Sequence, residues 1–90
     1  DMENSVKKAE DLVRQIDDAE KFMKKEKYDK AIQYAKKIKD KIKKMRQSGL
    51  EERGVYSVEN LAFKLLRRSG DIGRLLDVIN DSYDKKMSIS

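Results

Sequence analysis

A chain of 90 residues has room for one domain with one hydrophobic core. Charged residues make up 43% of it, and it contains neither Cys nor His, which excludes disulfide frameworks, thiolate metal sites and catalysis through an imidazole. The chain has no Pro and only four Gly, and Lys, Glu, Ala, Leu and Ile are prominent, a profile that favours amphipathic helices over sheet.

The apolar runs of the chain are short. None approaches the roughly 20 residues of a membrane-spanning helix and no signal-peptide core is present, so we expect no transmembrane segment. Asp1 precedes Met2, which indicates a fragment of a longer chain. Because a chain without Cys suits any redox environment, the compartment stays open, with an intracellular one favoured.

Residues 5–24 carry the first helical pattern. Asn4 or Ser5 is suited to cap its start, because a short polar side chain can accept a hydrogen bond from a first-turn amide. Apolar side chains recur at spacings of three and four, which predicts one buried stripe. Its members are Val6, Ala9, Leu12, Val13, Ile16, Ala19 and Met23.

Residues 28–47 form the clearest helical pattern. At 100° per residue, the five stripe positions fall within about 80° of arc, and mostly Lys and Gln fill the opposite face. After this helix, Gly49 is suited to the left-handed C′ position, from which Leu50 can pack back on the last turn. The stripe consists of Ala31, Ala35, Ile38, Ile42 and Met45.

A third helix is predicted over residues 58–68, after a loop at residues 51–55. Ser57 has the chemistry of an N-cap, and Glu59 in the first turn interacts favourably with the positive end of the helix dipole. The apolar positions of this helix are Val58, Leu61, Ala62, Leu65 and Leu66, with Phe63 to one side.

A fourth helix is predicted over residues 71–84. Ser69-Gly70 ends the helix before it, and Asp71 is suited to cap its start. We expect the residues after Asp84 to fray. The side chains expected to face inward are Ile72, Leu75, Leu76, Ile79 and Tyr83.

Four amphipathic segments with short connections predict an all-α fold, a single helical domain over residues 1–90. The first two helices are long and should form an antiparallel hairpin, which the two shorter helices would close into a compact bundle. The stripes do not keep strict heptads, so an extended coiled coil is not expected.

The formal charge of +5 is unevenly distributed along the chain. Residues 1–23 sum to −3, residues 24–46 to +8 with eleven basic and three acidic side chains, and residues 47–90 to zero. The positive field therefore belongs to the second predicted helix and the turn before it. A smaller basic cluster, at the junction of the third and fourth helices, consists of Lys64, Arg67, Arg68 and Arg74.

Two interpretations of this charge stay open. It is either a cationic surface for nucleic acid, anionic lipid or an acidic peptide, or a solvated helix face on which Asp40 pairs with Lys36 or Lys44. No aromatic side chain lies among the outward Lys residues to stack on bases, so any nucleic-acid contact would be to the backbone. The candidate partner-binding residues are Lys36, Lys37, Lys43, Lys44, Lys64, Arg67 and Arg68.

The sequence contains few residues that could act together in catalysis. Neighbouring acids such as Asp17 and Asp18 point about 100° apart on a helix and cannot act as a dyad. No Gly-rich phosphate loop and no EF-hand spacing occurs, so we expect no enzyme activity, no cofactor and no metal site.

Residues 19–38 resemble one helical hairpin of a tetratricopeptide repeat and the related hairpin of microtubule-interacting-and-transport domains. Both families place a small residue and an aromatic late in the first helix, and a Tyr followed by Ala at the start of the second. Here those positions are Ala19, Phe22, Tyr28 and Ala31. The resemblance implies a close helix crossing and a helical groove that receives a peptide or partner helix.

The expected function is therefore that of a protein-interaction module. It would bind a peptide or partner helix in a groove of the bundle, with the Lys face steering acidic partners. The alternative is nucleic-acid or anionic-surface binding through the Lys-rich second helix and the Arg67/Arg68 cluster. Residues 56–79 also resemble helical modules of transcription elongation factors and of disulfide-isomerase relatives. A contiguous apolar groove favours the first function and a continuous basic face the second.

Overall fold

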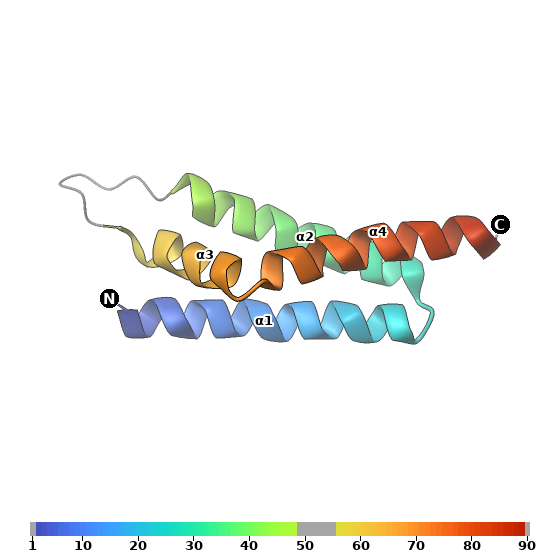
Figure 1. Ribbon diagram of the computed structural model, residues 1–90, viewed down its shortest axis with the longest axis horizontal. Coiled ribbons are helices and arrows are strands. Elements are labelled where there is room, and N and C mark those ends of the chain that lie inside the picture. The colour runs from blue at the N-terminus through green and yellow to red at the C-terminus, as the bar shows by residue number, and fades with distance from the viewer. Residues whose placement is uncertain (1, 49–55, 90) are drawn as a thin grey trace.

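The computed structural model describes residues 2–48 and 56–89, in which the regular secondary structure is helical. In chain order the helices are α1 (Met2–Lys24), α2 (Tyr28–Gln47), α3 (Val58–Arg68) and α4 (Asp71–Ile89). The helices pack against one another, so the predicted all-α bundle of four helices is confirmed. α1 and α2 form the antiparallel hairpin (Figure 1).

α3 and α4 close the hairpin by lying end to end along it, both running in the direction of α1 (Figure 1). Gly70 separates them, with a φ of +80° that suits Gly because other residues are strained there. The most extensive helix contact is between α2 and α4, while α3 packs chiefly on α1. The bundle is consequently elongated, at 53 × 20 × 17 Å.

The start of α1 differs from the prediction. The helix begins at Met2, so Asn4 and Ser5 lie inside its first turns and the predicted cap is wrong. Ser5 is instead buried, and its hydroxyl donates to the Val58 carbonyl at 3.1 Å. This hydrogen bond joins the beginning of α1 to the beginning of α3, a tertiary role that local sequence does not reveal.

The turn between α1 and α2 is a Schellman motif. The Lys27 amide donates to the Phe22 carbonyl at 2.9 Å and the Glu26 amide to the Met23 carbonyl at 3.0 Å. Glu26 occupies the left-handed position with a φ of 63°, where Gly is the usual residue. Tyr28 then opens α2, as the sequence predicts.

Capping is confirmed for α3 and corrected for α4. The Ser57 hydroxyl accepts from the Asn60 amide at 3.0 Å. Asp71 is the first residue of α4 and not the residue before it. The expectation that the chain frays after Asp84 is also wrong, because α4 continues to Ile89.

The part of α4 beyond the predicted end at Asp84 contacts α2. The Lys86 ammonium lies 2.6 Å from the Asp29 carboxylate, and this hydrogen bond raises the pKa of Lys86. The predicted cap at Gly49 and Leu50 and the predicted loop at residues 51–55 lie outside the described residues.

The core forms where all four helices meet, and all five predicted α2 stripe residues are buried in it. Leu76 and Tyr83 were expected to face inward, but they are 41% and 38% exposed. Val78 and Ser82 are buried in their place, since α4 is rotated relative to the predicted stripe. The core cluster comprises Ala9, Leu12, Ile16, Ala19, Ala31, Ala35, Ile38, Ile42, Met45, Ala62, Leu66, Leu75, Val78 and Ile79.

Candidate functional site

The Lys residues of α2 project to two opposite sides of that helix, since α2 has partners on both. Lys43 lines a groove bordered by α3 and α4, and its neighbour Lys44 lines a groove bordered by α1 and α3. Successive helical residues point about 100° apart, so a run of Lys residues cannot share one face. The predicted basic residues are therefore divided between two surfaces.

Two of the predicted residues are already engaged with tyrosines. The Lys36 ammonium donates to the Tyr83 hydroxyl at 2.6 Å and lies 5.2 Å from the ring centroid. The Lys64 ammonium lies 3.2 Å from the ring centroid of Tyr56, and its hydrogen bond lowers the pKa of that phenol. The first contact joins α2 to α4, and the second joins α3 to the residue that precedes its N-cap.

The remaining predicted residues are exposed to solvent. Arg67 lines the same groove as Lys43, whereas Lys37 and Arg68 line neither of the two grooves. Asp40 forms no ion pair among the described residues, so the expected pairing with Lys36 or Lys44 is not observed.

The α2–α3–α4 groove has a volume of about 780 Å³ and an apolar floor. Leu75 and Ile42 belong to the buried core, Phe63 and Ile72 are partly buried, and Leu76 is 41% exposed. Four cations and, among the residues that the structure describes, no acid complete its lining. The lining residues are Lys39, Ile42, Lys43, Arg46, Phe63, Arg67, Ile72, Leu75 and Leu76.

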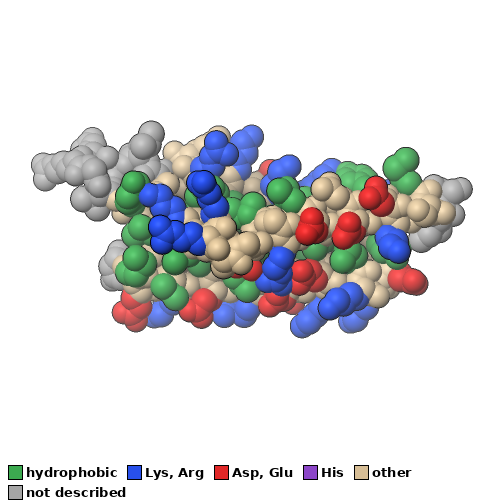
Figure 2. All heavy atoms as spheres, viewed as in Figure 1, with side chains coloured by type: hydrophobic (Ala, Val, Ile, Leu, Met, Phe, Trp, Pro, Cys, Tyr) green, Lys and Arg blue, Asp and Glu red, His purple; other side chains and the backbone are tan. Residues whose placement is uncertain are grey.

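Within the described part of the chain, acidic side chains do not balance the four cations of this groove. Within residues 2–48 and 56–89, no carboxylate pairs with Lys39, Lys43, Arg46 or Arg67. Figure 2 shows Lys and Arg side chains gathered over α3 and the adjoining part of α2, and acidic side chains over α4. The groove thus combines accessible apolar surface with an uncompensated positive field.

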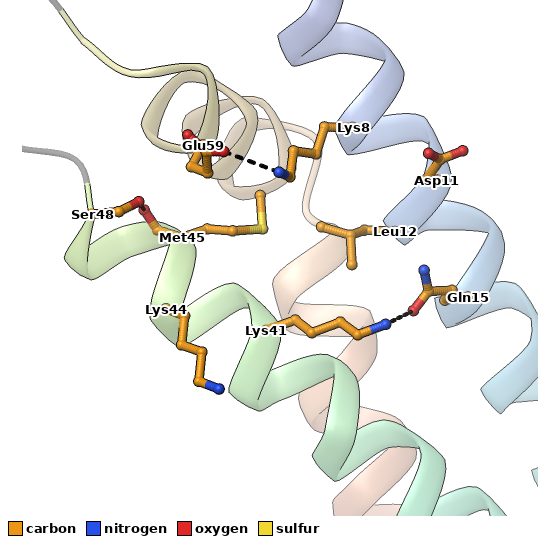
Figure 3. Close-up of a pocket in the computed structure, with 9 residues that line it drawn as sticks. All are labelled: Lys8, Asp11, Leu12, Gln15, Lys41, Lys44, Met45, Ser48 and Glu59. Carbon is orange, nitrogen blue, oxygen red and sulfur yellow. Dashed lines mark hydrogen bonds and ion pairs between the residues drawn. The ribbon is translucent and has the colours of Figure 1, made fainter.

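The α1–α2–α3 groove, on the other side of α2, has a volume of about 690 Å³ (Figure 3). Its floor is core, because Leu12 is 4% and Met45 5% exposed, and the two side chains point toward each other from α1 and α2. The lining residues are Lys8, Asp11, Leu12, Gln15, Lys41, Lys44, Met45, Ser48 and Glu59.

Polar groups of the α1–α2–α3 groove are largely matched within the chain. The Lys8 ammonium donates to the Glu59 carboxylate at 3.0 Å, and this hydrogen bond lowers the pKa of Glu59. The Lys41 ammonium donates to the Gln15 side chain at 3.2 Å (Figure 3). This second groove therefore presents less unsatisfied charge to a partner.

Arg74 fastens α4 to α1 on a third surface. Its guanidinium lies 2.5 Å from carboxylate oxygens of both Asp17 and Glu20 on α1, and 2.8 Å from Asp71. The hydrogen bonds that Arg74 donates to Glu20 and, second, to Asp17 raise the pKa of Arg74. The sequence grouped Arg74 with the basic cluster of α3, but its charge is compensated by three acids.

Several lining residues of the α2–α3–α4 groove were not singled out from the sequence. Lys39 and Arg46 lie four and three residues from Lys43, which the sequence did single out, so the three form one column of α2 that a helical projection would have found. Phe63 and Leu76 required the tertiary structure, because the groove exists only where α3 and α4 meet α2.

Among the described residues, no group of three or more acidic side chains is placed to hold a metal ion. Within the same ranges, none of the helices has the length and apolar character needed to cross a bilayer. Comparison of the chain with protein-family models, with curated proteins and with solved structures found no match.

Proposed function

We propose that the chain is a non-catalytic protein-interaction module that binds a peptide or partner helix in the α2–α3–α4 groove. The observation that carries this proposal is the partly exposed apolar floor. Leu76, Phe63 and Ile72 are large side chains left incompletely covered between three helices. Apolar surface in a concave site of several hundred Å³ is typical of binding sites, because a partner gains free energy by removing it from water.

The test begins with a library of random 16-residue peptides displayed against the immobilised protein. Amide chemical-shift changes then locate each selected peptide on the bundle. We expect the shifts to cluster on α2, α3 and the first half of α4, and Leu76→Ser to weaken binding while the protein stays folded. Shifts confined to the α1–α2–α3 groove would contradict the proposal.

The same protein should be titrated with a mixed-sequence DNA duplex at physiological salt. We expect only weak binding, because the cations of α2 are spread over two sides and Arg74 is already paired. A library that yields no peptide, together with tight and strongly salt-dependent duplex binding, would favour the nucleic-acid alternative.

A further inference from the structure

The polar edge of the α2–α3–α4 groove carries one sign of charge. Lys39, Lys43 and Arg46 border it from α2, and Arg67 borders it from α3. The α4 side supplies only Ile72, Leu75 and Leu76 to the lining, so the cations lie along one edge and apolar side chains along the other. Such a distribution attracts a ligand that is itself asymmetric in charge.

The backbone around the groove indicates the conformation of that ligand. The groove lies between helices, whose amides and carbonyls are bonded within each helix, and no strand edge occurs in the described residues. An extended peptide would therefore find no main-chain partners there. A helix satisfies its own backbone and can present apolar side chains at spacings of three, four and seven residues.

One end of the groove is limited by a contact between its two walls. Lys36 on α2 donates to Tyr83 on α4 at 2.6 Å, about one helical turn before Lys39 and two before Lys43. The cations available to a ligand are consequently concentrated toward the end of α2 and toward Arg67 on α3.

From these features we infer that the occupant of the groove is an acidic amphipathic helix of a partner protein. Its apolar stripe lies on Leu76, Phe63 and Ile72, and its carboxylates face Lys39, Lys43, Arg46 and Arg67. This inference rests on the proposed function and specifies the partner that the same groove selects.

The chain offers a matched pair of variants for the test. K39E/K43E reverses two exposed cations of the groove, and K37E/K44E reverses two exposed cations on the same helix outside it. Both variants change the net charge equally. Two synthetic 18-residue helical peptides with the same Leu stripe serve as probes, one with Glu and the other with Gln on its polar face.

Affinities are measured by fluorescence anisotropy at physiological salt, and circular dichroism verifies that each variant is folded. The wild type should bind the Glu peptide about tenfold more tightly than the Gln peptide. K39E/K43E should lose about tenfold in affinity for the Glu peptide, and K37E/K44E should stay within about twofold of wild type.

The contrary outcomes separate the two proposals. If both peptides bind equally and Leu76→Ser removes both, the groove binds helices without preferring acids, so this inference fails and the proposed function stands. If both double variants lose affinity equally, net charge rather than the groove attracts the peptide, and the inference is overturned. If neither peptide binds, or if binding survives Leu76→Ser, both proposals fail.

Discussion

The two grooves on either side of α2 share that helix and both contain Lys residues, but they differ in what these charges contact. In the α1–α2–α3 groove, Lys8 and Lys41 are hydrogen-bonded to Glu59 and Gln15. In the α2–α3–α4 groove, the cations have no such partner within the described part of the chain. The Lys residues of one helix therefore do not form one surface. Whether each of them can bind a partner depends on the side chain that the neighbouring helix places opposite it.

The apolar floors of the two grooves also differ in how far their side chains are exposed to solvent. Leu12 and Met45 are 4% and 5% exposed and contribute to the core, whereas Leu76 is 41% exposed. Substitutions in the first floor should therefore act on folding, and substitutions of the incompletely covered side chains of the second floor, above all Leu76, should act on binding.

Leu12→Ala should lower the free energy of unfolding by about 2–5 kcal/mol, because it removes buried methyl groups and leaves a cavity among packed helices. Chemical denaturation monitored by circular dichroism measures the loss. A cost no larger than that of Leu76→Ala would show that the two floors are equivalent.

Ala31→Leu tests the core that both grooves share. Ala31 has no exposed surface at the α1–α2 crossing, so a larger side chain should overpack it and cost about 1–3 kcal/mol. Gln33→Leu, at an exposed position of α2, is the control and should leave the melting temperature nearly unchanged. An unchanged melting temperature for Ala31→Leu would contradict a close crossing of α1 and α2 at Ala31, and with it the family resemblance that implies this crossing.

Arg74→Ala tests whether α4 is fastened as one wall of the α2–α3–α4 groove. The substitution leaves Asp17, Glu20 and Asp71 without their shared cation, and should cost about 1–2 kcal/mol, moderated by the partial exposure of Arg74. It should also weaken peptide binding, although Arg74 does not line the groove. Arg68→Ala is the matched control, since Arg68 is exposed, and should change neither quantity measurably.

Leu76→Ala should cost about 1 kcal/mol or less in stability, because much of its side chain is already in water. The same substitution should reduce the affinity for peptides selected on the groove. Isothermal titration calorimetry and denaturation on one sample separate the two effects. A large loss of stability without loss of affinity would assign Leu76 to the core.

The smallest effect concerns pH and the α1–α2–α3 groove. Its hydrogen bond to Lys8 lowers the pKa of Glu59 from the ordinary value of 4.5, so the stabilisation is present above pH 4.5 and is lost as the pH falls through the lowered pKa. Because the Glu59 side chain is 38% exposed, the contribution should be only about a few tenths of a kcal/mol. Lys8→Gln should remove this pH dependence, and an identical acid titration in wild type and variant would contradict it.

The approximate ranges predicted for the second and third helices coincide with α2 and α3, since polar turns and the Ser57 cap delimit strong apolar stripes. The predicted ranges of the first and fourth helices were too short at their outer ends. No Pro or Gly marks these ends in the sequence, and the contacts that stabilise them are tertiary. The site was only partly predictable. Lys43 and Arg67 were named, but two of the three acids that neutralise Arg74, Glu20 and Asp17, lie 54 and 57 residues away in sequence and leave no local signal.

The break at Gly70 sets the direction in which the apolar side chains of α4 point relative to those of α3. Leu66 and Leu75 are buried on the same core yet lie nine residues apart, which in an uninterrupted helix is about two and a half turns. A continuous helix would therefore direct them to opposite sides. The left-handed turn at Gly70 cancels this half-turn offset, so that two helices of unrelated phase complete one core. If the turn straightened, one of the two apolar stripes would face solvent, where the hairpin of a second molecule would be its nearest cover.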